Sequence, residues 1–222
     1  MKNNQRRKGW VRLIKIEKLT KVIKGRTVLD DVNMLFEDGK IYGLYGRNGS
    51  GKTMLLRATA GLIFPTEGSI YIDDAKLHEQ ISFPPSVGVI IENTNLLPQY
   101  DGFTNLQILA KIKNIITDEE IKNTLTLVGL DAESKLKVKA YTLGMKQKLA
   151  IAQAIMEKPK LLLLDEPTNA LDEESILKVR EILLELKEHG TTIIIASHNK
   201  EDLGVLADVQ LKIVDGKISE IV

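Results

Sequence analysis

The segment GRNGSGKT, Gly46 to Thr53, constrains the fold more than any other part of the sequence. It matches the phosphate-loop pattern, in which a glycine and four variable residues precede glycine, lysine and serine or threonine. An apolar strand pattern, GKIYGLYG, runs into it, and a helical pattern from Met54 to Ala60 follows. This order of strand, glycine loop and helix predicts a site for a nucleoside triphosphate at the start of the helix.

The residue types of this loop suit the chemistry of a triphosphate. Glycines allow backbone N–H groups to close on phosphate oxygens, Lys52 can reach the β- and γ-phosphates, and the Thr53 hydroxyl can ligate Mg²⁺. A chance glycine turn is the alternative, and the flanking strand and helix patterns argue against it. The expected nucleotide contacts in this loop are the following residues: Gly46, Arg47, Asn48, Gly49, Ser50, Gly51, Lys52, Thr53 and Met54.

Two further segments end in residues that suit phosphate hydrolysis. LLLLDE has the pattern of a buried strand; Asp165 at its tip is predicted to hold Mg²⁺, and Glu166 to act as general base on the attacking water. TTIIIASH is a second buried-strand pattern, and His198 at its end is predicted to sense the γ-phosphate. The alternatives are an acidic pair that only ends a strand, and a histidine that is structural or merely exposed.

Strand and helix patterns alternate along most of the chain, which predicts an α/β fold. The buried strand patterns favour a mostly parallel sheet, and the strand patterns in WVRLIKIEKL and GSIYIDDAKL favour a separate antiparallel β subdomain. Between about Thr104 and Pro159 helical patterns dominate. This helical insertion includes a capping box formed by Thr117 and Glu120, and a helix stop at Gly129.

Length and composition limit the remaining possibilities. We divide the 222 residues into a basic tail, residues 1–9, and one nucleotide-binding domain, residues 10–222, with a helical subdomain at about 93–158. The 31 Lys and Arg against 30 Asp and Glu leave a net charge of +1, so no global field favours nucleic acid as a partner. The absence of cysteine excludes disulfides, thiolate metal sites and a cysteine nucleophile. No apolar run approaches the roughly 18 residues that cross a bilayer.

The segment AYTLGMKQKLAIAQAI predicts a helix with an anion site at its N-terminus. Apolar residues recur in it at helical spacing, Thr142 stands at the cap position, and Gly144 and basic side chains follow. A helix N-terminus with a hydroxyl, a glycine and lysines nearby attracts anions. The basic tail at the other end of the chain lacks the apolar segment of a signal peptide, which leaves a solvated tail or a contact with acidic lipid or a partner.

Five motifs in this order resemble the nucleotide-binding domain of ABC transporters: GRNGSGKT, YTLGM, LLLLDEP, NALD and ASH. The resemblance covers about Leu13 to Ile221 and implies that the triphosphate is ATP. In that family the segment like YTLGM is the signature motif, so Thr142 and Gly144 would complete the ATP site of a second subunit. Asp172, in the segment like the D-loop, would lie across the same interface. The resemblance therefore implies a dimer with two shared ATP molecules, for which a homodimer is sufficient.

Several positions depart from the family pattern. The usual signature is LSGGQ, whereas here Leu143 replaces the first glycine and Met145 replaces the glutamine. Glu92 stands where the family has a glutamine that contacts Mg²⁺, and a carboxylate is the stronger ligand, with a solvated loop acid as the alternative. Ile23 stands at the usual place of an aromatic that stacks on adenine, which puts adenine specificity in question. Met54 replaces a frequent second threonine.

The resemblance implies an ATP-hydrolysing subunit of an ABC membrane transporter, bound to a separate transmembrane permease at the cytoplasmic face of the cell membrane. Glu92 together with LGMKQ resembles the branch of bacitracin- and lantibiotic-resistance exporters, which favours export of antimicrobial peptides or drugs. An ABC importer ATPase and a non-transport ABC-type ATPase of chromosomes or ribosomes are the alternatives. Four apolar residues near Glu92 are expected either to contact the permease or to pack within the subdomain: Leu96, Leu97, Tyr100 and Phe103.

Overall fold

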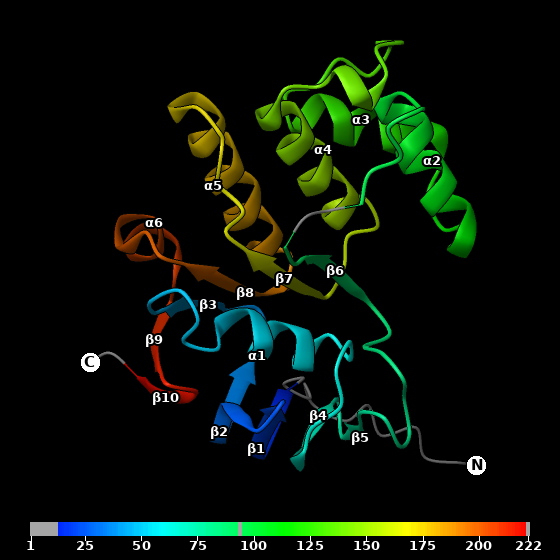
Figure 1. The fold of residues 1–222 in the computed structure, drawn as a ribbon. Coiled ribbons are helices and arrows are strands. Elements are labelled where there is room, and N and C mark those ends of the chain that lie inside the picture. Colours follow the sequence, from blue (N-terminus) through cyan, green and yellow to red (C-terminus); the bar gives the residue numbers. More distant parts are fainter. Residues whose placement is uncertain (1–12, 93–94, 221–222) are drawn as a thin grey trace, which may run out of the picture.

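The computed structural model describes residues 13–92 and 95–220. Two β-sheets and a set of helices make up this part of the chain (Figure 1). The strands are β1 (Leu13–Ile23), β2 (Arg26–Glu37), β3 (Ile41–Tyr45), β4 (Glu67–Ile72), β5 (Ala75–Lys76), β6 (Val87–Ile90), β7 (Leu161–Asp165), β8 (Thr192–Ser197), β9 (Val209–Val214) and β10 (Lys217–Glu220). The helices are α1 (Lys52–Thr59), α2 (Gly102–Lys113), α3 (Asp118–Leu127), the 3₁₀ turn η1 (Val138–Ala140), α4 (Leu143–Ile155), α5 (Glu173–Glu188) and α6 (Lys200–Leu206).

The smaller sheet is antiparallel and has the strand order β2-β1-β4-β5. Its long hairpin joins β1 to β2 through Lys24 and Gly25, which have φ values of 49° and 77°. Two successive positive φ values are typical of the two-residue turns that match the twist of a hairpin. The last cross-strand pair before this turn is Ile23 with Arg26. The predicted antiparallel β subdomain is therefore confirmed.

The larger sheet has the order β10-β9-β3-β8-β7-β6. Its pairs are parallel except for the terminal hairpin of β9 and β10. The hairpin turns at Asp215 and Gly216, as the sequence predicts, and both have positive φ. Side chains of the central strands are buried on both faces, as expected for parallel strands covered by other layers. The predicted mostly parallel sheet is confirmed.

Alternate residues of the parallel strands face two different cores. In β8, Ile193 and Ile195 pack with the helices α4 and α5, whereas Ile194 and Ala196 pack with α1 and the antiparallel sheet. The sheet is thus the middle layer, with α4 and α5 above it and α1 below it in Figure 1. Helices α2 and α3 lie beside α4 and form the helical region at the top of the same view.

Helix ends in this region follow the local chemistry of the sequence. The Thr117 hydroxyl accepts from the backbone N–H of Glu120, and the Glu120 carboxylate accepts from that of Thr117, which confirms the capping box. Gly129, with a φ of 77°, follows the end of α3. The Thr142 hydroxyl caps α4 by accepting from the N–H of Met145. The predicted cap of this helix is confirmed, and α4 begins at Leu143, directly after the cap.

Three elements differ from the sequence expectation. Helix α1 begins at Lys52 and not at Met54, because its first two residues are polar and do not show in an apolar pattern. The sequence patterns do not predict strand β6 or helix α6. They have only four and seven residues, which is too short for a periodic pattern to stand out.

The parallel sheet brings the functional motifs together at one edge. Tyr45 at the end of β3 pairs with Ser197 at the end of β8, and Asp165 at the end of β7 pairs with Ala196. The residues that follow these strand ends are therefore neighbours, as expected at the carboxyl edge of a parallel sheet. Within the described residues no helix is long and apolar enough to cross a membrane. The basic tail, residues 1–9, lies outside the described residues, and the proposed domain division stays a prediction.

Candidate functional site

A cavity of about 760 Å³ lies between the phosphate loop and the β1–β2 hairpin. Cavities of this size fall in the range that holds small organic ligands. Ten of the predicted site residues line it: Asn48, Gly49, Ser50, Gly51, Lys52, Thr53, Met54, Glu92, Asp165 and Glu166. Four lining residues come from the hairpin: Ile23, Lys24, Arg26 and Val28.

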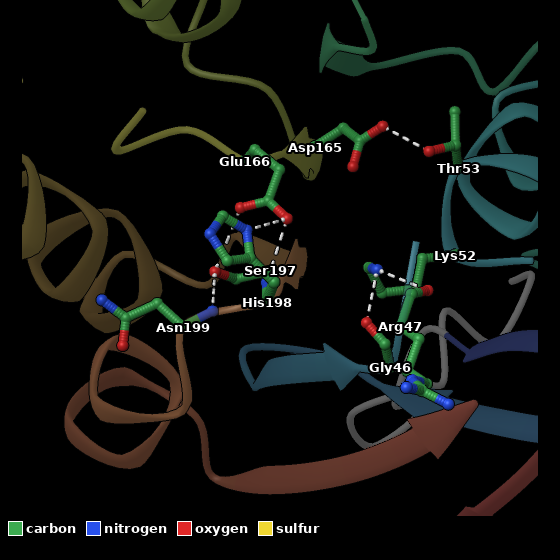
Figure 2. A network of polar contacts seen from close by, with 9 residues as sticks. All are labelled: Gly46, Arg47, Lys52, Thr53, Asp165, Glu166, Ser197, His198 and Asn199. Carbon is green, nitrogen blue, oxygen red and sulfur yellow. Dashed lines mark hydrogen bonds and ion pairs between the residues drawn. The ribbon is translucent and has the colours of Figure 1, made fainter. Parts of the chain in front are cut away.

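The phosphate loop presents a helix N-terminus and a lysine to this cavity. Gly51 occupies the cap position of α1 with a φ of 115°, and no described side chain caps the first turn. The Lys52 side chain is buried, and its ammonium donates to the backbone carbonyls of Gly46 at 2.7 Å and Arg47 at 3.4 Å (Figure 2). Uncapped N–H groups and an ammonium at one point form an anion site. Gly46 and Arg47 themselves are absent from the described lining of the cavity.

Two glycines of the loop are required by close packing. A Cβ on Gly46 would lie 2.6 Å from the Ser50 hydroxyl and would overlap the backbone carbonyl of Ile213 in β9. A Cβ on Gly51 would lie 2.7 Å from the Val28 carbonyl, at a positive φ that side chains rarely adopt. The loop is therefore pressed against both sheets, which fixes the direction of its backbone N–H groups.

Asp165 and Thr53 meet across the start of α1. The Thr53 hydroxyl donates to an Asp165 carboxylate oxygen at 2.6 Å, and Figure 2 shows the two side chains pointing at one another. Desolvation raises the pKa of Asp165, and the nearby carboxylates of Glu166 and Glu92 raise it further, against the lowering effects of the Thr53 bond and Lys52. A carboxylate held in this way gains from a cation nearby.

Glu166 and His198 form a direct pair, which sequence analysis did not predict. One Glu166 carboxylate oxygen lies 2.8 Å from His198 Nδ1 and accepts from the His198 backbone N–H at 2.9 Å. The other oxygen accepts from the Ser197 hydroxyl at 3.3 Å, as Figure 2 shows. Glu166 has a φ of 51°, a strained value for this residue type that is common at functional sites. The predicted base is thus held by the predicted sensor at the ends of two adjacent strands.

Glu92 lies two residues after the end of β6 and lines the cavity. Its carboxylate accepts from the Arg57 guanidinium at 2.8 Å, and its φ is 57°. Arg57 lies on α1, one helical turn after Thr53, and so on the same face of the helix. This four-residue spacing is the signal by which the sequence could have identified Arg57 as a residue near the site. The predicted role of Glu92 as a metal ligand stays a prediction, and the Arg57 pair would have to open or shift for it.

The residues expected to act on a second subunit stand apart from the cavity. Thr142, Gly144 and Asp172 are all missing from its described lining. The Asp172 carboxylate caps α5 by accepting from the Ser175 N–H, and hydrogen bonds with the side chain and the backbone of Ser175 lower the pKa of Asp172. Leu143, between Thr142 and Gly144, is 71% exposed. Within one chain, then, the side chains of Thr142 and Asp172 cap helices, and the predicted nucleotide contacts of all three residues stay predictions.

The protein oxygens near the phosphate loop suit Mg²⁺ only in part. Among the described residues, no three acidic, histidine or cysteine side chains gather as a metal site. Thr53 and Asp165 nevertheless bring a hydroxyl and a carboxylate to one point. Mg²⁺ is commonly held by one or two carboxylates together with substrate phosphates, so this donor set fits the ion in the presence of a nucleotide.

Comparison with known proteins gives the same picture. The family model described as ABC transporter matches residues 29–169. The ABC transporter ATP-binding protein YybJ of Bacillus subtilis (strain 168) is 58% identical over 206 residues, which is 93% of this chain and 94% of that protein. The bacitracin transport ATP-binding protein BcrA of Enterococcus faecalis is 42% identical over 199 residues, which is 89% of this chain and 65% of BcrA.

A solved structure supports the fold assignment. The dimeric structure of MJ0796, a bacterial ABC transporter cassette, is similar with a TM-score of 0.86 at 25% sequence identity. The similarity covers 93% of this chain and 96% of that one. The family match extends over more than half of the chain and the relatives are well above 30% identical, so this chain belongs to the ABC transporter ATP-binding family and is an ATP-binding, ATP-hydrolysing subunit.

Proposed function

We propose that this chain is the motor subunit of a membrane exporter for antimicrobial peptides or drugs. It acts as a dimer, with ATP and Mg²⁺ held between two copies. The ATPase activity in this proposal is supported by one cavity. Lys52, Glu166 and the hydrogen-bonded pair of Thr53 and Asp165 all line it. The residues proposed for triphosphate binding, metal binding and water activation thus lie at one edge of the sheet.

Nucleotide binding follows from groups that are poorly satisfied by the protein itself. The Ser50 hydroxyl is buried and has no hydrogen-bond partner among the described residues. Among the described residues, the Lys52 ammonium donates to backbone carbonyls alone, which it can exchange for β- and γ-phosphate oxygens. The uncapped first turn of α1 adds backbone N–H groups aimed at the same place. Thr53 and Asp165 would hold Mg²⁺, which, when bound, offsets the negative charge of the phosphates.

Hydrolysis requires a base that is held in position. Glu166 is suited to accept a proton from the attacking water, and its contacts with Ser197 and His198 fix the carboxylate. With Nδ1 turned to Glu166, the other ring nitrogen of His198 is left to hydrogen-bond to the γ-phosphate. The general base and the phosphate contact are then coupled through one hydrogen bond.

A second copy of the chain would complete each site. The exposed N-terminus of α4 carries Thr142 and Gly144 on the surface and outside this chain's own cavity. Such a helix N-terminus is suited to bind the γ-phosphate of a nucleotide on another subunit. The dimeric MJ0796 structure supports this arrangement for a similar fold.

The transport role rests on relatives and on surface chemistry. The similarity to BcrA, a bacitracin transport ATP-binding protein, supports an antimicrobial peptide or drug as cargo. Since no described helix crosses a membrane, the proposal needs a separate permease, which would hold this chain at the cytoplasmic face of the membrane. Leu97 and Tyr100, 36% and 40% exposed, are proposed permease contacts, whereas Leu96 and Phe103 also pack against the core.

The first test of the site is Glu166→Gln, which keeps the shape of the side chain and removes the base. We expect ATP binding to persist and turnover to fall by about 10²-fold or more, the usual contribution of a general base. The ATP-bound variant should also elute as a stable dimer in gel filtration. Glu188→Gln, at the exposed end of α5, is the matched control. Unchanged turnover in Glu166→Gln would refute the base assignment.

The transport proposal is tested by purifying the tagged chain from its native membrane and sequencing the proteins that co-purify. We expect a polytopic permease without an extracytoplasmic binding protein. Recovery of such a binding protein would assign the chain to an importer. Recovery with DNA or ribosomes, and no membrane protein, would refute transport and leave the ATPase chemistry unaffected.

A further inference from the structure

Two exposed basic side chains lie beside the nucleotide cavity without lining it. Arg47 stands two residues after β3, and neither it nor Lys200 of α6 belongs to the described lining. Lys200 Nζ lies 4.7 Å from the centroid of the Tyr45 ring, so both cations are found at the carboxyl end of β3. Neither side chain forms a hydrogen bond or an ion pair within residues 13–92 and 95–220. Their charge is thus available to a further partner.

The position of Lys52 makes Arg47 the outer basic group of the phosphate loop. The segment GRNGSGKT contains these two basic residues. Lys52 is buried and donates to the carbonyls of Gly46 and Arg47, as Figure 2 shows. The Arg47 guanidinium therefore adds positive charge to the surface beside the cavity, whereas Lys52 supplies the cation of the cavity itself.

The start of α5 carries an exposed pair of acidic side chains. Asp172 caps this helix, and its carboxylate accepts from the Ser175 N–H. Glu173 and Glu174 follow in the first turn, and neither side chain forms a hydrogen bond or an ion pair with another described residue. The helix dipole favours acids at this position, which stabilises the helix but leaves the outward carboxylate oxygens in solvent.

Contacts within one chain hold the start of α5 next to the N-terminus of α4. A Cβ on Gly144 would lie 3.0 Å from the carbonyl oxygen of Ala170. The Gln147 side-chain amide donates to the Pro167 carbonyl at 2.8 Å. The segment before α5 is therefore fixed to the first turns of α4. When the N-terminus of α4 contacts a γ-phosphate on another copy, the start of α5 approaches the phosphate loop of that copy.

From these observations we propose that Arg47 and Lys200 form ion pairs with the partner subunit's Glu173 and the partner subunit's Glu174 when ATP closes the dimer. The inference rests on the proposed function, because it concerns the dimer in which α4 of one copy reaches the nucleotide of the other. Each copy carries both surfaces, so a two-fold dimer contains the contact twice. Without the cations, the acidic start of α5 would approach a triphosphate of like charge, which is unfavourable. Complementary charges also select one orientation of the two copies.

Charge reversal on each surface tests the proposal in the Glu166→Gln background, in which the ATP-bound dimer is expected to persist. The acidic variant is Arg47→Glu with Lys200→Glu, and the basic variant is Glu173→Arg with Glu174→Arg. We expect each variant to raise the Kd of the dimer about tenfold or more, measured by sedimentation with ATP and Mg²⁺. An exposed ion pair changes Kd by up to about fivefold, and the contact occurs twice.

A mixture of the two variants distinguishes contacts across the interface from effects within one chain. In a mixed dimer the acidic loop faces a basic α5, and the basic loop faces an acidic α5, so that every pair again has opposite signs. We expect the equimolar mixture to associate with a Kd within about threefold of the Glu166→Gln parent, although each variant alone associates poorly. A mixture that associates no better than its components would overturn the inference.

Two controls accompany the charge variants. Lys111→Glu with Lys135→Glu makes the same change in net charge at exposed lysines of the helical region and should leave the Kd of the dimer unchanged. Calorimetric titration of the acidic variant with ATP is the second control, and we expect it to bind ATP. Loss of ATP binding would place Arg47 or Lys200 on the nucleotide and would overturn the proposed ion pairs.

The same measurements separate this inference from the proposed function. If the Glu166→Gln parent forms no dimer with ATP, the proposed shared site fails. If the parent forms a dimer and both charge variants associate as tightly as the parent, only the proposed ion pairs fail.

Discussion

Asp165 is placed where a carboxylate is unfavourable without a cation. It lies at the tip of a buried strand, beside Glu166, and desolvation is the largest cause of its raised pKa. The Asp165 carboxyl therefore binds its proton more tightly in the folded state than in the unfolded state. As a result, the free energy of unfolding falls as pH rises from 3.8, the ordinary pKa of this group, through its raised pKa in the folded state. Ionised Asp165 is therefore a cost to stability, as is common for functional residues.

Replacing this residue should therefore stabilise the nucleotide-free protein. We expect Asp165→Asn to raise the Tm at pH 7, because the amide is neutral and still accepts from Thr53. A gain of about 1 kcal/mol would appear as roughly 2–4 °C for a chain of this size. The gain should shrink as pH falls towards 3.8, and Mg²⁺ with ATP should stabilise the variant less than the wild type. Thermal scans from pH 7 downwards would contradict the assignment if the two Tm values were equal at pH 7.

At the scale of elements, the contact of β6 with α4 joins the helical region to the sheet. A Cβ on Gly88 would overlap the backbone carbonyl of Ala154, so strand and helix approach as closely as a glycine permits. The chain runs directly from this strand to Glu92. The position of Glu92 near the phosphate loop thus depends on how tightly β6 packs against α4.

Gly88→Ala should force these two elements apart. We expect it to destabilise the protein by about 1–3 kcal/mol, the usual cost of overpacking, as measured by urea denaturation. Gly204→Ala in α6 is the matched control, because its Cβ would meet nothing within 4 Å. The control should be neutral or more stable by about 0.5–1 kcal/mol, as expected for replacing glycine within a helix. Equal stability of the two variants would contradict the close approach of β6 and α4.

At the scale of the whole molecule, the predicted site residues fall into two sets. Lys52, Thr53, Asp165 and Glu166 meet within one chain, whereas Thr142 lies at an exposed helix end outside their cavity. In the proposed dimer, a complete site would consist of one set from each of two chains. In a symmetric dimer this arrangement generates two equivalent sites.

Two inactive variants should therefore restore activity to each other. Lys52→Ala and Thr142→Arg should each hydrolyse ATP poorly alone, although Thr142→Arg should still bind it. A mixed dimer contains one site with neither lesion, so an equimolar mixture should recover roughly a quarter of the wild-type sites if pairing is random. ATPase assays after mixing give the result, with Thr142→Ser, which keeps the cap, as the control. No recovery in the mixture would place both residues in the same site.

Individual site residues could be predicted from the sequence, whereas the contacts between distant residues of the site could not. Local patterns predicted the phosphate loop, Asp165 and Glu166, because glycine spacing and buried strand ends are properties of short segments. The pair of Arg57 with Glu92 joins residues 35 apart in the chain, and no local pattern links them. Roles of the individual site residues stay predictions until the variants are measured.

Periodicities, helix caps and the glycine loop all depend on neighbouring residues, so the sequence predicts an α/β nucleotide-binding protein without a structure. The contact of His198 with Glu166, and the position of Ile23 and Arg26 in the same cavity as the phosphate loop, are visible only in three dimensions. Both depend on which strands lie side by side and which face of a hairpin turns inwards. The physical reason is that strand order and register result from packing of the whole core, and the local pattern of any one strand is compatible with several neighbours.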